Sequence, residues 1–290
     1  MRRWMLVAGL AAIMALAPTA GAAQSEDGVR VRAFRFYRAE SGQTLVTAFV
    51  EVPYVLLEVP ADGSSAELKY GVVVSITDSS GVQLNKAAWP GQARADLRRP
   101  GAVALEILDF SLAPGKFQIK VTVTDSTSGK SYSSSQDVVA WSTPPRASDL
   151  MLSPSMRLAT GSDTMPHAGE RRWGNTMVTP ATRLQLTPLR SKAFYLVEAY
   201  AQTADSGTMS VRVSDSAGKV LVQSRPTRVD IAPGGSVLKG QLDLAGLPAG
   251  EYTMTVHLDV AGHQEDRSDQ FEMANFQETM QREESRLEAL

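Results

Sequence analysis

The 290-residue sequence contains no cysteine. This absence excludes a disulfide framework, a zinc or iron–sulfur site with cysteine ligands, and a cysteine nucleophile. Histidine is scarce as well: the three in the chain are His167, His257 and His263, and their positions match no paired metal-ligand spacing. The sequence therefore predicts neither a metal site nor a bound cofactor.

Long hydrophobic runs are missing after the first 23 residues. Arg2 and Arg3 precede an uncharged apolar stretch at 4–17, and small residues follow at 20–23. This order is typical of a cleavable secretory signal peptide, and the stretch is shorter than the roughly 20 residues that span a bilayer. An uncleaved N-terminal anchor is the alternative. We expect residues 1–23 to be a signal peptide, with no membrane span after its cleavage, no lipid-bearing cysteine, and a periplasmic or secreted mature protein.

Basic residues are slightly fewer than acidic ones. The 29 Lys and Arg against 31 Asp and Glu give a formal net charge of −2. Removing the signal peptide takes away two arginines and no acid, so the net charge falls from −2 to −4. Because nucleic-acid binding favours a basic surface, the composition argues against a nucleic-acid partner.

From residue 29 onward the sequence reads as short strands. Apolar and polar side chains alternate at 70–77, 117–124, 209–214 and 252–259. An alternation of period 2, rich in β-branched residues, is typical of half-buried strands. The predicted fold class is therefore all-β.

One strand changes its parity. Val29, Val31 and Ala33 share one face, whereas Phe34 and Phe36 lie on the other. A bulge near Ala33 or Phe34 would restore a single inward face. The alternative is a strand that is covered on both sides.

Two turns of one type introduce an internal repeat. The motifs D-S-S-G at 78–81 and D-S-A-G at 215–218 each follow an alternating strand, and Asp first with Gly fourth is typical of a type I turn. Around them, 74–84 matches 211–221, and 112–123 matches 247–258 in the same order. The repeat predicts two tandem immunoglobulin-like β-sandwiches.

The Pro-Pro pair at 144–145 marks the boundary between the two copies. We assign a first β-sandwich domain to 29–141, a linker to 142–147 and a second β-sandwich domain to 148–272. Residues 273–290 are rich in good helix formers and predict a short C-terminal amphipathic helix. This helix either packs on the second domain or forms a homodimer.

The segment R-F-Y-R-A-E-S-G-Q-T-L-V-T-A-F-V-E-V-P at 35–53 resembles the first domain of bacterial proteins named for a GWxTD motif. The D-S-S-G turn, the strand L-A-P-G-K-F, the segment at 148–153 and the opening of the second domain at 178–200 are similar to theirs. The Gly-Trp-x-Thr-Asp motif itself is absent. The resemblance implies tandem immunoglobulin-like sandwiches in an exported bacterial protein, and it implies no catalytic residue.

The sequence holds no catalytic constellation of a familiar kind. Ser236 and Lys239 match S-x-x-K, but the motifs that accompany this pair in serine chemistry are absent. Four aspartates at strand ends have the residue type of a calcium site, and turn capping is the preferred interpretation. They are Asp78, Asp125, Asp215 and Asp259.

Aromatic residues beside arginines are the candidates for a binding surface. The candidate residues are Trp89, Trp141, Trp173, Arg171 and Arg172. Trp173 lies in the polar stretch 153–175, which we expect to be a long loop. An exposed tryptophan there could contact an anionic partner or a sugar. The alternative is a loop aromatic folded back onto the sandwich edge.

We expect a non-enzymatic interaction or scaffold protein of the bacterial cell envelope. Loops at the sandwich ends, above all 156–174, would contact an envelope protein partner. A carbohydrate- or ligand-binding module that uses the tryptophans is the alternative. A hydrolase with an unfamiliar site is the third hypothesis, since one fold hosts many functions.

Overall fold

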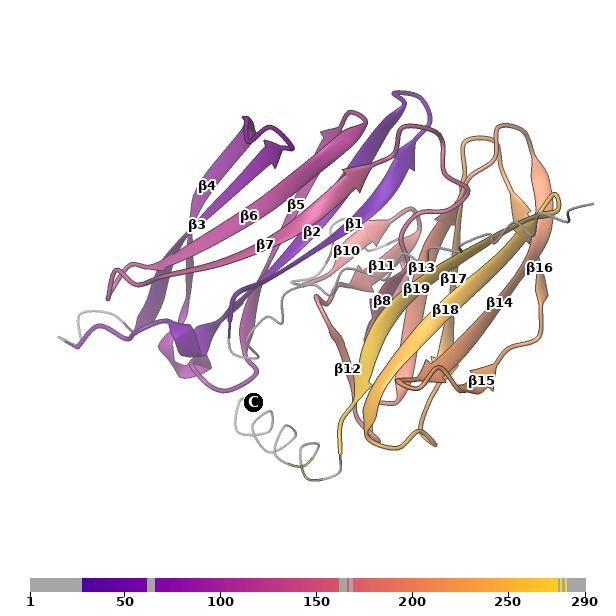
Figure 1. The fold of residues 1–290 in the computed structure, drawn as a ribbon. Helices are drawn as coiled ribbons and strands as arrows, with labels where there is room; N and C mark the ends of the chain where they lie inside the picture. The colour runs from indigo at the N-terminus through magenta and orange to yellow at the C-terminus, as the bar shows by residue number, and fades with distance from the viewer. Residues whose placement is uncertain are drawn as a thin grey trace, which may run out of the picture.

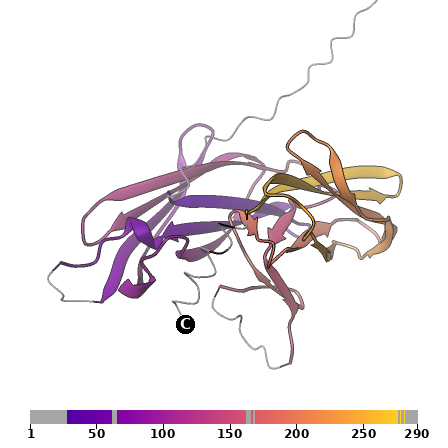
Figure 2. The ribbon, with the colours of Figure 1, turned by 90° about the horizontal axis from the view of Figure 1, so that it is seen from below.

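The computed structural model describes residues 28–61, 66–161, 166, 169–275, 277 and 280, which form two bodies of strands lying side by side (Figures 1 and 2). Two three-residue 3₁₀ helices, at Tyr54–Leu56 and Ala95–Leu97, interrupt the strands of the first body. Within the described part of the chain, no helix is long and apolar enough to cross a membrane. The fold is all-β, as predicted.

Two antiparallel sheets face each other in the first body, which we call the first sandwich. One sheet has three strands in the order β1-β2-β5: β1 (Arg30–Arg38), β2 (Gln43–Pro53) and β5 (Val103–Leu112). The other has four strands in the order β4-β3-β6-β7: β4 (Gln83–Arg94), β3 (Glu67–Asp78), β6 (Gly115–Asp125) and β7 (Ser131–Ala140). Their inner faces bury one hydrophobic core, which includes Val31, Val50, Val72, Ile119 and Val121.

The second body, the second sandwich, also packs two sheets around one core. The smaller sheet has the order β17-β13-β8: β17 (Ser236–Asp243), β13 (Lys192–Ala199) and β8 (Met151–Ser153). The larger sheet has the order β12-β19-β18-β14-β15: β12 (Leu184–Leu186), β19 (His263–Met273), β18 (Gly250–Val260), β14 (Asp205–Asp215) and β15 (Val220–Gln223). β16 (Thr227–Ile231) also pairs with β14. A small third sheet contains β9 (Ser155–Leu158), β10 (Arg171–Trp173) and β11 (Thr176–Thr179).

The predicted alternation is confirmed in the strands that form the two cores. In β6 the apolar residues from Phe117 to Val123 are buried, and the residues between them are partly or fully exposed. In β18 the apolar side chains from Tyr252 to Leu258 lie in the second core. Period 2 therefore identified the inward faces correctly.

The aspartates of the two matching turns cap those turns. Asp78 Oδ1 accepts hydrogen bonds from the backbone N–H of Ser80 at 2.9 Å and of Val82 at 3.0 Å. Asp215 Oδ1 accepts from Lys219 N–H at 2.9 Å in the same way. The fourth turn residue has φ 83° at Gly81 and 81° at the matching glycine, a conformation that glycine adopts without strain. Turn capping, the preferred interpretation, is confirmed for these aspartates.

Asp125 caps the β6–β7 turn from a buried position. Its carboxylate accepts hydrogen bonds from the backbone N–H of Ser128 at 3.0 Å and of Thr127 at 3.3 Å. Burial of the carboxyl acts to raise its pKa, but the hydrogen bonds from Ser128, Thr127 and Glu58 outweigh it and hold the pKa below its ordinary value. Among the described residues, no three His, Asp or Glu side chains are grouped so that they could hold a metal ion.

The parity change in β1 arises because both faces of this strand are covered. The pairing of β1 with β2 is regular from Arg30 to Arg38, so the bulge alternative is wrong. Val31 and Ala33 lie in the first core. Phe34 and Phe36 lie instead in a separate cluster formed with the second sandwich. The strand thus contributes to two hydrophobic clusters at once.

The predicted C-terminal helix at 273–290 is wrong at its first residue. Met273 ends β19, where it pairs with Gly250 and Leu186 and fills the second core. The next residue, Ala274, donates its N–H to the Leu186 carbonyl at 2.8 Å. The rest of that segment lies almost entirely outside the described residues, and so does the predicted dimer contact.

Candidate functional site

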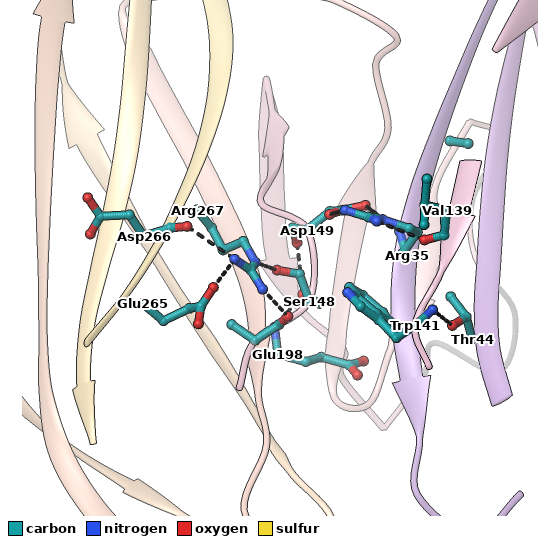
Figure 3. Close-up of polar contacts among 12 residues, drawn as sticks. Arg35, Thr44, Val139, Trp141, Ser148, Asp149, Glu198, Glu265, Asp266 and Arg267 are labelled. Atoms are coloured by element: carbon teal, nitrogen blue, oxygen red, sulfur yellow. Dashed lines mark hydrogen bonds and ion pairs between the residues drawn. The ribbon is translucent and has the colours of Figure 1, made fainter. Parts of the chain in front are cut away.

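The two sandwiches are fastened together by Arg35 of β1 (Figure 3). Its guanidinium donates to both carboxylate oxygens of Asp149, from Nε at 2.9 Å and from Nη2 at 2.7 Å. Nη1 donates to the Val139 carbonyl at 2.8 Å, and the guanidinium carbon lies 4.8 Å from the ring centroid of Trp141. A bidentate arginine–carboxylate pair is stronger and geometrically more specific than a single hydrogen bond. Arg35 therefore fixes the direction in which the chain enters the second sandwich.

The start of the second sandwich is held from its other side by Arg267 of β19 (Figure 3). Nε donates to the Ser148 carbonyl at 2.8 Å, and Nη2 donates to the Ala147 carbonyl at 3.0 Å. The Ser148 hydroxyl in turn accepts a hydrogen bond from the Glu198 backbone N–H at 2.8 Å. The backbone between the two cores is thus bonded to β13 and β19.

An apolar cluster lies between the sandwiches, and we call it the inter-sandwich cluster. Its buried members are Phe34, Phe36, Phe49, Met151, Trp173, Val178 and Leu196. The ring centroids of Phe36 and Trp173 are 5.7 Å apart. This contact is apolar and excludes water, as a domain core does. The two sandwiches are therefore joined by a packed interface and not by a flexible linker alone.

Further polar pairs surround this cluster. Arg38 donates to Glu198 at 2.8 Å, and the Tyr200 hydroxyl both donates to Glu198 at 2.7 Å and accepts from Tyr37 N–H at 2.8 Å. Burial raises the pKa of Tyr200, and the nearby charge of Glu198 raises it further. These buried groups are paired across the interface, as buried polar groups must be.

Asp269 is the most deeply buried acid of the interface. Arg32 of β1 forms an ion pair with it across the two sandwiches. Burial raises the pKa of Asp269, and the charge of Arg32 opposes that rise. Removing Arg32 would leave a buried carboxyl without its cation.

The sequence leaves Trp173 either as an exposed binding residue or as a loop aromatic folded back onto the sandwich edge. Trp173 is 7% exposed and packs on Phe36, so the binding interpretation of this residue is wrong and the folded-back alternative holds. Arg171 lies over its ring at 5.0 Å and forms an ion pair with Asp109 of β5. Arg172 is exposed on the same short strand. Trp173 and Arg171 thus serve the contact between the sandwiches.

The stretch 153–175 is not the long loop that we expected. It contains β9, β10 and the start of a turn into β11, and Arg157 of β9 forms a bidentate pair with Glu170 at 2.8 and 2.7 Å. Residues 162–165 and 167–168 lie outside the described residues. Because Trp173 is part of the inter-sandwich cluster, replacing 156–174 would disturb the fold as well as any contact.

The remaining candidates of the sequence lie apart from one another. Ser236 Oγ accepts from Ala232 N–H at 2.9 Å, whereas the Lys239 ammonium donates to Asn175 at 3.2 Å and to Thr176. The two therefore have separate partners. His257 pairs with Asp266 at 2.6 Å on the outer face of the second sandwich.

Trp89 leads to a different feature, the edge of the first sandwich formed by β4 and β5. The Gln136 side chain of β7 bonds the Ala33 backbone of β1, which brings β1 and β7 to the opposite edge. From that edge, three strands face four, and among the described residues no strand covers the first half of β4, where Asn85 and Ala87 lie. We call this the open edge.

Side chains on the core-facing side of β4 are exposed, which shows that nothing in the described structure covers them. Asn85 and Ala87 stand opposite the buried residues Ile76 and Val74 of β3, so they share the core-facing side of the sheet. Both are nevertheless exposed. A side chain that points toward the core and still meets solvent marks a gap between the layers.

Glu106 of β5 bridges the two layers beside this gap. Its carboxylate accepts a hydrogen bond from the Trp89 indole N–H at 3.1 Å and from the Tyr70 hydroxyl at 3.2 Å. Burial and the charge of Glu106 raise the pKa of Tyr70. Both donors are neutral, so neither supplies a positive charge to offset the carboxylate.

Beyond Glu106 the gap widens into a cleft of about 440 Å³. Buried apolar residues form its floor and exposed residues form its rim, among them Ile76, Leu84, Asn85, Phe110, Leu112 and Phe117. Leu84 at the rim is 53% exposed. The cleft has the size of a small-ligand site and the mixed lining that such sites have.

In the second sandwich, β15 and β16 take the position of β4. β14 pairs with β15 near its end and with β16 near its start. β16 brings Val229 and Ile231 into the second core, and Val222 of β15 packs against it. The contrast is therefore one of exposure: β17, like β5, is the last strand of its sheet, but only the first sandwich leaves core-facing residues of the neighbouring edge exposed.

The sequence did not point to this edge, because residues 83–94 carry no clear alternation. The usable signal was that four of the five alternate positions from 85 to 93 carry small or short side chains, Asn85, Ala87, Gly91 and Ala93, while the fifth is Trp89. Small side chains on a core-facing side leave room for something else. Gly91 itself accommodates the Tyr70 ring, since an added Cβ would lie 2.2 Å from it.

No family model and no curated protein matches this sequence. Solved structures with similar strand arrangements include red sea bream transglutaminase (7% identity, 85% of this chain and 31% of that chain, TM-score 0.26). Others are the BSP domain of a biofilm associated protein (12%, 86% and 30%, TM-score 0.33) and Escherichia coli alpha-2-macroglobulin (11%, 85% and 22%, TM-score 0.28). The chain spans about a third or less of each. At these TM-scores the likeness supports no argument about function.

Proposed function

We propose that the chain is a non-enzymatic interaction module of the bacterial cell envelope that binds a protein partner at the open edge of its first sandwich. The observation that carries the proposal is the cleft beside β5, whose outer edge pairs with no described strand, together with the core-facing residues left exposed on β4. Unpaired strand edges and apolar clefts are templates for binding another chain. The contacts of Arg35 and Phe36 would hold this edge in a constant orientation.

We include in the proposal that the two sandwiches are tandem immunoglobulin-like copies. The order β1-β2-β5 corresponds to β8-β13-β17, and β4-β3-β6-β7 corresponds to β15-β14-β18-β19. The matching segments 74–84 and 211–221 fall on corresponding strands. The signal-like residues 1–23 support export, and the patterns shared with GWxTD proteins support kinship with that family.

The carbohydrate-binding alternative has less support. It needs a tryptophan face open to a ligand, but Trp141 lies under Arg35, and Trp89 is tied to Glu106. Trp173 is buried.

Site-specific photo-crosslinking in intact cells tests the proposal. A photoreactive residue at Leu84, on the rim of the cleft, should form an adduct with one protein. The matched control is Leu189, which is 64% exposed on the second sandwich and should form none. Absence of an adduct at Leu84, or equal adducts at both positions, would contradict the proposed site.

A further inference from the structure

The open edge has the geometry of a sheet that lacks one strand. β5 is a ten-residue strand that pairs with β2 on one side and, within the part of the chain that the structure describes, with no strand on the other. Strands in a sheet lie about 4.8 Å apart, so a strand added beside β5 would lie opposite β4. It would cover Asn85 and Ala87, the two core-facing residues that are exposed.

The two edge strands, β4 and β5, differ in how well they could pair with an added strand. β4 carries Pro90, which has no N–H, and Lys86, and both residues discourage strand addition. β5 contains neither proline, glycine, lysine nor arginine over Val103–Leu112. Its free edge can therefore pair along its whole length.

We propose that β5 binds an extended segment of a partner protein, which adds a fourth strand to the sheet β1-β2-β5. This inference rests on the proposed function and specifies how the partner is recognised. Backbone hydrogen bonds to β5 would supply affinity, and side chains that enter the gap would supply specificity.

The side chains of β5 determine the chemistry of the partner. Glu106, Leu108 and Phe110 share one face, because side chains alternate along a strand. An apolar partner residue opposite Phe110 would enter the cleft. Glu106 lies four residues before Phe110 on β5, about 13 Å away along the strand. A Lys or Arg of the partner would stand opposite Glu106, whose hydrogen-bond donors are both neutral. The recognised pattern is an apolar residue and a basic residue four positions apart on one face.

A second copy of this chain fits the edge less well. Pairing of β5 with itself would bring together strands that each carry Glu106 and Asp109 and no base. Like charges on adjacent strands are destabilising. Charge complementarity therefore favours a basic partner segment.

Fluorescence polarisation with synthetic peptides tests this assignment on the chain as purified after export. Probe R is a fluorescein-labelled ten-residue peptide of alternating threonine and valine, with a leucine and an arginine four positions apart on the valine face. Probe E carries glutamate in place of that arginine. We expect probe R to bind, and probe E to bind about tenfold more weakly or worse. Probe R with alternate backbone nitrogens methylated should lose binding, since it cannot donate to a strand.

Protein variants locate the site. Glu106→Gln should weaken probe R about tenfold and strengthen probe E, since the repulsion between the two carboxylates is removed. Ala87→Arg, at an exposed position of β4, should abolish binding of probe R by filling the gap, with a circular dichroism spectrum like that of the unmodified protein. The matched control, Asp137→Asn on the far edge strand β7, should change nothing.

Equal binding of probes R and E, full binding of the methylated probe, or no binding of probe R would overturn strand addition at β5. The proposed function fails separately. An adduct at Leu84 combined with no binding of probe R would leave a partner at the edge but exclude this mode of recognition. Binding of probe R without any adduct in cells would contradict the proposed function alone.

Discussion

Replacing Phe36 with alanine should lower the free energy of unfolding by about 3–5 kcal/mol, the usual cost of deleting a buried phenylalanine. Phe36 is fully buried, and it packs between the two sandwiches rather than inside either one. The cavity would therefore weaken their mutual contact. We expect the unmodified protein to unfold in urea in one transition and the variant in two, with the emission of Trp173 shifted to the red.

Val31→Ala is the matched control, because Val31 lies on the opposite face of the same strand. This substitution should lower the free energy of unfolding by about 2 kcal/mol, because it removes apolar contacts in the first core alone. Trp173 should keep its emission in this variant. A loss below about 1 kcal/mol for Phe36→Ala, with one transition retained, would mean that the inter-sandwich cluster does not couple the two bodies.

Arg35→Ala should cost about 2–3 kcal/mol, because it removes three charge-assisted hydrogen bonds and leaves Asp149 without its guanidinium. The Arg35 side chain is 30% exposed, so we place the expected cost at the lower end for a buried pair. Arg35→Lys should recover only part of the loss, since an ammonium cannot bind both carboxylate oxygens in the same plane. Urea denaturation measures the free energy of unfolding of the unmodified protein and of the two variants.

The exposed pair of Arg94 and Asp96 provides the contrast. The Arg94 side chain is 79% exposed, and Arg94→Ala should change stability by less than about 0.5 kcal/mol. If Arg35→Ala were equally harmless, the pair with Asp149 would be a surface contact and not a fastening between the sandwiches. A double-mutant cycle with Asp149→Asn separates the pair energy from the loss of the Val139 contact.

The strands of both cores could be predicted from the sequence because each has one buried face. Period 2 placed Val72, Ile119, Val121 and Val256 inward, and all four are buried. The turn aspartates were predictable for a similar reason, since Asp78 bonds residues only two and four positions away. Local chemistry is visible in a local pattern.

The parity change in β1 indicated that the strand could be covered on both faces, but it did not indicate which segment covers the second face. Phe34 and Phe36 needed a cover, but nothing near them in the sequence says what that cover is. The place of Trp173 stayed open between two alternatives for the same reason. A tryptophan after two arginines in a polar stretch fits an exposed site or one folded back, and the phenylalanine that buries it comes from a distant strand.

The open edge was not predictable, because it depends on strand order in two sheets at once. Residues 83–94 show no clear alternation, since Asn85 and Ala87 stand at core-facing positions that no described strand covers. This gap follows from the three-against-four arrangement of the sheets. No single stretch of the sequence contains this information.

Hydrogen–deuterium exchange should be compared between the free chain and the chain saturated with probe R. We expect amides of β5 that face the open edge to exchange quickly in the free protein and to become protected when the probe binds. The amides of β2, which are already paired on both sides, should not change. Protection that appears on the second sandwich, or nowhere on β5, would contradict the claim that the first sandwich lacks a strand which a partner supplies.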